Sequence, residues 1–194
     1  MHIAKLVGRL VAAMAITTST VAYAETPGVT TTEIKFGETM PYSGPASAYA
    51  GSGHTHQAYF KMLNDRGGIN GRKLELISLD DSYSPPKTLE QTRKMVERDG
   101  VAFIFASLGT TPNRAIAKYL NQRGVPQLFI GTTATGFADP KNQPWTLGSM
   151  PTGETEAYLY AQYILKTHPD AKIGVLYAND DVGSTYLAGL KDGL

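Results

Sequence analysis

The chain has 194 residues, with 18 lysines and arginines, 17 aspartates and glutamates, and a formal net charge of +1. This near balance argues against a nucleic-acid partner, which normally needs basic residues gathered on one face. The sequence contains no cysteine, so it offers no disulfide and no thiol for a lipid anchor.

The N-terminal segment has the pattern of an export signal. Lys5 and Arg9 precede a mostly apolar run from Leu10 to Val21, and Ala22-Tyr23-Ala24 presents small residues at the two positions that a signal peptidase reads. The run is too short to span a bilayer. We therefore expect cleavage of residues 1–24 and a soluble mature protein in the periplasm, the alternatives being a membrane anchor or a buried first helix.

The rest of the chain alternates strand and helix patterns. In order, we expect a strand at 33–37, a helix at 46–65, a strand at 74–79, a helix at 85–99, a strand at 101–106, a helix at 112–123, a strand at 127–130, a loop at 131–143, an extended segment at 145–148, a helix at 154–166, a strand at 172–177 and a helix from 181 onward. This order predicts an α/β fold with a doubly wound parallel sheet. The Pro- and Gly-rich stretch at 136–151 suggests a first lobe at 25–143 and the start of a second lobe at 144–194.

Ligands of such sheets bind at the carboxyl ends of the strands, which directs attention to the loops at 40–51, 107–111 and 131–135. The second of these loops leads from the apolar run 101–106 into a helix start at Pro112. Free backbone N–H groups and the helix dipole favour an anion there, and Ser107, Thr110 and Thr111 add hydroxyls. The alternative is that Thr111 only caps its own helix.

The two other loops offer further contacts. Gly131 allows close backbone approach, and an exposed carbonyl with a threonine hydroxyl could accept hydrogen bonds from a ligand ammonium, although a plain turn rich in Ser and Thr is the alternative. Tyr49 follows Ser43-Gly44-Pro45, where its ring could pack on a ligand or in the core.

Several kinds of site are not expected. His54 and His56 are two residues apart, so on a helix they face different directions and do not jointly hold a metal. Asp80-Asp81 and Asp180-Asp181 precede turns or helix starts, where turn formation and capping explain them. Dinucleotide-loop, phosphate-loop and Gly-x-Ser-x-Gly patterns are missing. We expect no metal, no cofactor and no enzymatic activity.

Specific runs of residues resemble a known family. They are Pro-Tyr-Ser-Gly-Pro-Ala at 41–46, Asn-Asp-Arg-Gly-Gly-Ile-Asn-Gly-Arg-Lys-Leu at 64–74, the acidic pair at 80–81, Gly-Val-Pro at 124–126 and Lys-Ile-Gly-Val-Leu at 172–176. Over essentially the whole mature chain, the sequence resembles the type I periplasmic binding proteins of the leucine/isoleucine/valine-binding group. Members have two α/β lobes that close over a ligand.

The resemblance implies roles for individual residues. Thr110 and Thr111 would bind the ligand carboxylate, Gly131 and Thr133 its ammonium, and Tyr49 would face the ligand. Two features depart from the family. Val182 stands where members commonly have a tyrosine, and members continue well beyond this length, so the chain is expected to be partial.

The function that the resemblance implies is that of an extracytoplasmic substrate-binding component of an ABC importer. Its ligand would be a branched-chain amino acid or a related small amino or aromatic carboxylate, and its partner a membrane permease, with the binding protein itself a monomer. A ligand-sensing regulatory protein on the same fold is the alternative.

Overall fold

The structure is a computed structural model that describes residues 26–137 and 139–194, so the expected export signal lies outside the described residues. The elements follow in this order: β1 (Glu33–Met40), the 3-10 turn η1 (Ser47–Tyr49), α2 (Ala50–Asp65), β2 (Lys73–Asp80), α3 (Pro85–Lys94), the π-helical turn η2 (Met95–Asp99), β3 (Ile104–Phe105), α4 (Thr110–Arg123), β4 (Gln127–Ile130), the 3-10 turn η3 (Thr135–Phe137), β5 (Thr146–Gly148), α5 (Gly153–Thr167) and α6 (Asp181–Gly193).

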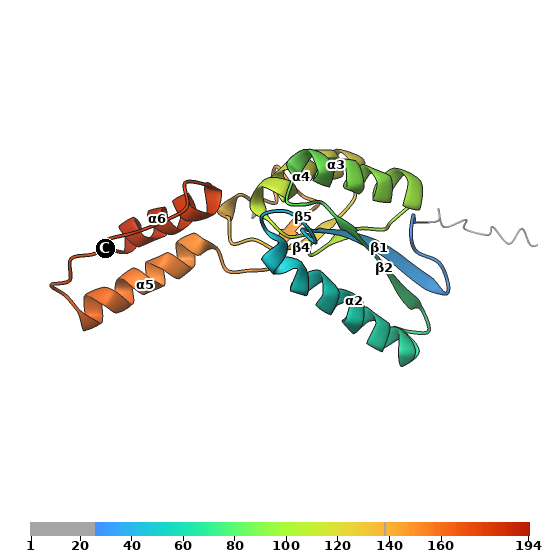
Figure 1. Ribbon diagram of the computed structural model, residues 1–194, viewed down its shortest axis with the longest axis horizontal. Helices are drawn as coiled ribbons and strands as arrows, with labels where there is room; N and C mark the ends of the chain where they lie inside the picture. The colour runs from blue at the N-terminus through green and yellow to red at the C-terminus, as the bar shows by residue number, and fades with distance from the viewer. Residues whose placement is uncertain (1–25, 138) are drawn as a thin grey trace, which may run out of the picture.

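The strands form one parallel sheet in the order β2-β1-β3-β4-β5. Helix α2 covers one face of the sheet, and α3 and α4 cover the other (Figure 1). This arrangement confirms the predicted α/β doubly wound sheet. The chain leaves β1 toward β2 on one side and returns to β3 on the other, so the strand order reverses beside β1, where such sheets open a binding crevice.

Alternate residues of β1 face opposite layers, as the two-residue repeat of a strand requires. Phe36 packs edge-on against Phe60 of α2, with ring centroids 4.9 Å apart. Gly37 points the other way, where an added Cβ would lie 2.4 Å from the Met95 sulfur. On that second face a buried cluster fills the space under α3 and α4; its members are Met95, Val101, Ile104, Ile116 and Leu120. β1 is thus fixed between two packed layers.

The apolar run at 101–106 forms a shorter strand than expected, since only Ile104 and Phe105 are assigned to β3. Its backbone is nevertheless tied to both neighbours: Gly37 N–H donates to the Phe103 carbonyl at 3.0 Å, and Ala106 N–H donates to the Leu128 carbonyl at 2.8 Å. Ala106 has φ of 48°, a left-handed conformation that ends the strand. The predicted buried central strand is present but turns away early.

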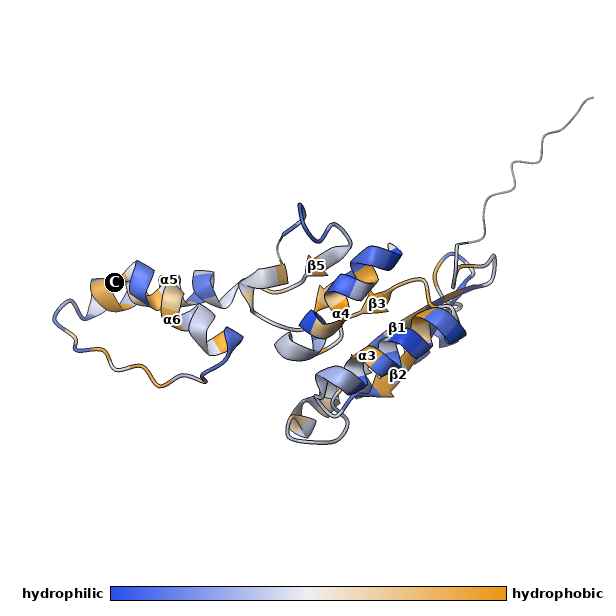
Figure 2. Ribbon diagram, turned by 90° about the horizontal axis from the view of Figure 1, so that it is seen from above, coloured by the Kyte–Doolittle hydropathy of each residue, from blue (hydrophilic) through white to orange (hydrophobic). Residues whose placement is uncertain are grey.

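The strand predicted at 172–177 is not formed. This segment carries no strand hydrogen bonding and lies exposed between α5 and α6, with Leu176 fully exposed at 101%. Figure 2 shows it as a loop with hydrophobic residues along it. A strand needs a neighbour to pair with its N–H and C=O groups, and the described residues place none beside it. The apolar residues at 172–177 are therefore not sufficient to form a strand.

Within the extended segment predicted at 145–148, Thr146–Gly148 form the strand β5. β5 pairs with β4, with Gln127 opposite Thr146 and Leu128 opposite Leu147. The sheet therefore extends to Gly148. Beyond it, α5 and α6 pack closely, since an added Cβ at Gly189 would lie 2.1 Å from the Glu154 carbonyl oxygen. Among the described helices, none has the length and apolar character that a membrane span needs.

Candidate functional site

A cleft of about 800 Å³ lies at the carboxyl ends of the strands. Its walls come from the loop after β1, from α2, from the turn after β2, from the loops that follow β3, β4 and β5, and from the start of α6. A smaller hollow of about 550 Å³ lies beside the middle of α4 and includes Arg114 and Lys118. The larger cleft coincides with the crevice where the strand order reverses, so it is the candidate ligand site.

The first turn of α4 opens into this cleft. Gly109 is the N-cap residue with φ of 105°, a conformation that favours glycine. Thr110 begins the helix, whereas the sequence suggested Thr111 as the cap and Pro112 as the first helical residue. The earlier start follows from Asn113, whose amide nitrogen donates to the carbonyls of Ser107 at 2.8 Å and Gly109 at 2.7 Å. These two hydrogen bonds tie the first turn of α4 to the loop that precedes it.

Hydrogen bonds join the loop before α4 to the loop after β4. Gly109 N–H donates to the Gly131 carbonyl at 3.2 Å, and Gly131 N–H donates to the Ser107 carbonyl at 3.0 Å. The hydroxyls of Thr110 and Thr132 are 2.5 Å apart. One lone pair of the Gly131 carbonyl is left over for a ligand donor. The two loops therefore form a single wall with donors and acceptors side by side.

The six residues expected at the site divide into two groups. Tyr49, Thr110, Gly131 and Thr133 line the cleft. The Tyr49 side chain is exposed, so its ring does not pack in the core.

Ser107 and Thr111 do not line the cleft. Ser107 is buried at 1% exposure, and its hydroxyl oxygen accepts a hydrogen bond from Thr39 N–H at 2.8 Å. Thr111 is exposed at the second position of α4. Ser107 thus supports the site from behind: its side chain fixes the end of β1 relative to the loop that carries Thr110.

Among the described residues, the lining of the cleft contains hydroxyls and aromatic rings but no lysine or arginine. An anion in it would depend on the N-terminal N–H groups and dipole of α4 together with neutral hydroxyls. Tyr83 lies over this helix start, since a Cβ on Gly109 would meet its ring at 2.4 Å. Burial raises the pKa of the Tyr83 phenol, while the N–H of Thr110 opposes that shift, so Tyr83 stays neutral.

Tyr83, Phe129 and His56 line the cleft without having been expected there, whereas Val182 had been singled out from the resemblance. Tyr83 and Phe129 both take positive φ of 58°, which turns their side chains toward the cleft and which no sequence pattern announces. His56 reaches the cleft from α2, and Val182 from the start of α6. Tyr83 lies in the turn that was recognised for its Ser, Asp and Pro content. The signal in the sequence that could have identified it is that it is an aromatic residue in an otherwise polar turn.

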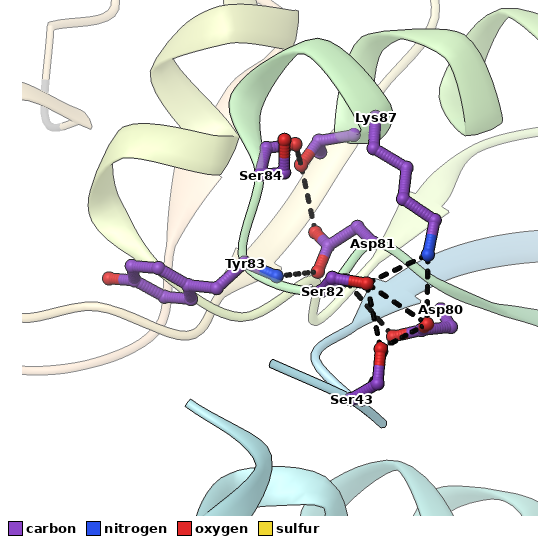
Figure 3. A network of polar contacts seen from close by, with 8 residues as sticks. Ser43, Asp80, Asp81, Ser82, Tyr83, Ser84 and Lys87 are labelled. Carbon is purple, nitrogen blue, oxygen red and sulfur yellow. Dashed lines mark hydrogen bonds and ion pairs between the residues drawn. The ribbon is translucent and has the colours of Figure 1, made fainter. Parts of the chain in front are cut away.

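The loop after β1 is held by the turn after β2. Asp80 accepts hydrogen bonds from Ser43 N–H at 3.1 Å, Ser43 Oγ at 2.6 Å and Lys87 Nζ at 2.8 Å (Figure 3). Asp81 accepts from Tyr83 N–H and from the Thr88 hydroxyl, both at 2.9 Å. The acidic pair therefore builds the turn, as expected from the sequence. Burial raises the pKa of Asp80, but the hydrogen bonds from Lys87 and Ser43 outweigh it and hold this pKa well below its usual range.

Replacing Asp80 by asparagine should lower the free energy of unfolding by about 1–2 kcal/mol at neutral pH, since several hydrogen bonds to a partly exposed charge are lost. A depressed folded-state pKa means that the carboxylate stabilises the fold fully above the unfolded value of about 4 and loses this contribution as the pH falls further. The difference between wild type and Asp80→Asn should therefore shrink in acid. Urea unfolding at neutral and acidic pH measures it.

The matched control is Asp65→Asn. Asp65 pairs with Lys61 at 2.7 Å, but both side chains are mostly exposed, so the change should be close to zero. Equal effects of the two substitutions, or a difference for Asp80→Asn that is independent of pH, would contradict the assigned role of Asp80.

Comparisons with known proteins agree with this fold. The family model described as "Periplasmic binding protein" matches residues 33–194. Leu/Ile/Val-binding protein homolog 3 of Brucella melitensis is 29% identical over 182 residues, which are 90% of this chain and 47% of that protein. The chain therefore spans less than half the length of this curated relative.

Two solved structures are similar in fold. A solute-binding protein of an ABC transporter from Rhodopseudomonas palustris, in complex with 3,4-dihydroxybenzoic acid, has a TM-score of 0.71 at 19% identity, over 83% of this chain and 43% of its own. A branched-chain amino acid transporter substrate-binding protein from Streptococcus pneumoniae, in complex with isoleucine, has a TM-score of 0.70 at 20% identity, over 82% of this chain and 46% of its own.

The family match covers both the sheet that carries the cleft and the α5–α6 pair, and the curated relative is a homologue of the leucine/isoleucine/valine-binding proteins. The resemblance drawn from the sequence motifs is thereby confirmed, and the chain belongs to the periplasmic binding protein family.

Proposed function

We propose that this chain forms the ligand-binding cleft wall of an extracytoplasmic solute-binding component of an ABC importer. The observation that carries the proposal is the first turn of α4, which opens into a cleft lined by hydroxyls and aromatic rings. Such a site suits a small carboxylate. The carboxylate would lie against the N–H groups at the start of α4 and the Thr110 hydroxyl.

The neighbouring loop would hold an ammonium group where the ligand has one. The free lone pair of the Gly131 carbonyl and the hydroxyl of Thr133 line the same wall, and both are acceptors. Tyr49 would cover the ligand from the rim. The Leu/Ile/Val-binding homologue and the isoleucine and dihydroxybenzoic acid complexes of the similar structures support an amino or aromatic carboxylate as the ligand class.

The proposal includes a location and a partner. The export pattern in residues 1–24 and the family match support delivery to the periplasm. There the ligand would stabilise a closed form by contacting both lobes, and the closed form would be recognised by a membrane permease. Binding rather than catalysis is the physical task, because the cleft offers contacts for a carboxylate and the family consists of binding proteins.

Titration of the ¹⁵N-labelled protein followed by NMR tests this function, because it detects even weak binding and locates it. Leucine and benzoate should shift the amide signals of Gly109, Thr110 and Gly131. Leucinamide, which keeps the ammonium and the side chain but lacks the carboxylate, should leave the α4 signals unchanged. Shifts confined to other parts of the chain, or equal shifts with leucinamide, would refute a carboxylate site at α4.

A further inference from the structure

A buried acidic residue lies directly behind the cleft. Glu38, on β1, is 0% exposed. Its Oε2 is 2.7 Å from His56 Nδ1, and its Oε1 accepts a hydrogen bond from the Ser78 hydroxyl at 2.7 Å. The Ser78 hydroxyl is bonded in turn to the Tyr42 phenol, which accepts from the Gln57 amide at 2.7 Å. The proposed carboxylate site uses none of these groups.

His56 connects this buried network to the cleft. Its side chain is 27% exposed and lines the cleft, while its Nδ1 is bonded to Glu38. The ring also packs edge-on against Phe105, with centroids 5.6 Å apart. In the part of the chain that the structure describes, Nε2 has no protein hydrogen-bond partner. The ring is therefore fixed on one side and leaves one nitrogen free for a ligand.

Because Glu38 is buried, it determines whether Nε2 of His56 carries a hydrogen atom. Within the described residues, His56 is the only basic side chain at ion-pair distance from Glu38. An uncompensated carboxylate is costly at a fully buried position, so the pair favours one additional proton. If that proton is on Glu38, the acid donates to Nδ1 and the neutral ring carries its hydrogen on Nε2. If it is on the ring, both nitrogens carry hydrogen. In either form Nε2 carries a hydrogen atom and is the ring nitrogen that is not bonded to Glu38.

The electrostatics of Glu38 agree with this shared proton. Burial raises the pKa of the Glu38 carboxyl, and the hydrogen bonds from Ser78 and His56 only partly oppose the shift. Burial of Glu38 therefore acts in the direction that keeps a proton on the Glu38–His56 pair.

His56 and Thr110 enter the cleft from opposite layers. His56 is on α2, which covers one face of the sheet, and Thr110 begins α4, which covers the other (Figure 1). Tyr49, Tyr83 and Phe129 lie along the same cleft and offer aromatic surface to a flat ligand. A ligand whose carboxylate meets α4 therefore extends past these rings toward α2.

We propose that His56 is a specificity-determining residue of the cleft, whose Nε2–H donates a hydrogen bond to a second oxygen atom of the ligand, away from its carboxylate. Glu38 is the positioning residue that fixes the tautomer and orientation of the ring. The preferred ligand class is an aromatic acid with an additional oxygen acceptor rather than a purely aliphatic amino acid. This inference rests on the proposed carboxylate site.

Hydroxybenzoates and methylbenzoates provide matched probes, because a methyl group has nearly the size of a hydroxyl but accepts no hydrogen bond. In NMR titrations of the wild-type protein, at least one of the three hydroxybenzoate isomers should bind about tenfold more tightly than the methylbenzoate of the same pattern. His56→Phe keeps an aromatic ring beside Phe105 and should bring the ratio of hydroxybenzoate to methylbenzoate affinity to about one.

Substitutions of Glu38 separate positioning from packing. In Glu38→Gln the amide can donate to Nδ1 and accept from Ser78, so Nε2–H and the preference for hydroxybenzoate should persist. Glu38→Leu removes both contacts and should lose the preference. Long-range ¹H–¹⁵N spectra of the His56 ring provide a direct readout that does not depend on a ligand: Nε2 should be protonated in the wild type and in Glu38→Gln.

Each outcome bears on one proposal. Benzoate binding at α4 without a preference for hydroxybenzoates, or a preference that survives His56→Phe, overturns the role of His56 and leaves the carboxylate site intact. An unprotonated Nε2 in the wild-type spectrum also overturns it, even if a variant fails to fold. Absence of binding by every carboxylate overturns the proposed function itself.

Discussion

Thr110→Val is expected to weaken carboxylate binding by about 10- to 100-fold, which corresponds to a lost hydrogen bond to a charged group of about 1.5–3 kcal/mol. Thr110 is the first residue of α4, is 4% exposed and lines the cleft. Valine has the same shape, so the cleft should keep its form. NMR titration with benzoate, compared with the wild type, measures the change.

Thr111→Val is the matched control for this experiment. Thr111 is the next residue of α4, but it is exposed and does not line the cleft. Its substitution should change the affinity by less than about twofold, since no ligand contact is lost. A larger loss with Thr111→Val than with Thr110→Val would contradict this placement of the carboxylate and would place the ligand further along α4.

Leu120→Ala is expected to lower the free energy of unfolding by about 2–5 kcal/mol. Leu120 is 0% exposed and belongs to the core cluster under α3 and α4. Its truncation removes apolar contacts and leaves a cavity in a layer that fixes the start of α4. Chemical denaturation followed by circular dichroism gives the change, and a loss of this size would unfold a marginally stable domain.

Leu176→Ala is the same substitution at a fully exposed position. Leu176 is 101% exposed in the segment between α5 and α6, so its truncation should change the stability by no more than about 0.5 kcal/mol. A large loss would mean that this segment is packed in solution, as the sequence pattern suggested, and would contradict the exposed conformation.

The local patterns predicted most of the first sheet correctly because they reflect local physical causes. Apolar runs separated by amphipathic stretches need a parallel sheet covered by helices. Pro85-Pro86 stands at the start of α3, and Gly124 ends α4 in a left-handed conformation with φ of 64°. The turn-forming role of Asp80-Asp81 also followed from residue type and neighbours.

Four of the residues expected at the site line one cleft, and their role in ligand binding stays a prediction. The carboxyl ends of parallel strands meet at one edge, so the loops around Tyr49, Thr110 and Gly131 had to converge. The role of Ser107 could not be read in this way. Its hydroxyl is taken by Thr39 N–H, a contact between residues far apart in the chain.

Tertiary structure alone decided the remaining features. The 172–177 segment has a strand pattern, but a strand exists only where another backbone pairs with it, and the described residues provide no such neighbour. The pairing of His56 with Glu38 depends on the packing of α2 over β1. The sequence supported one conclusion about His56, namely that it does not bind a metal ion together with His54. Residue types and their spacing thus determined the sheet, its turns and the position of the cleft, whereas the direction in which each polar side chain points was decided by the layers packed around it.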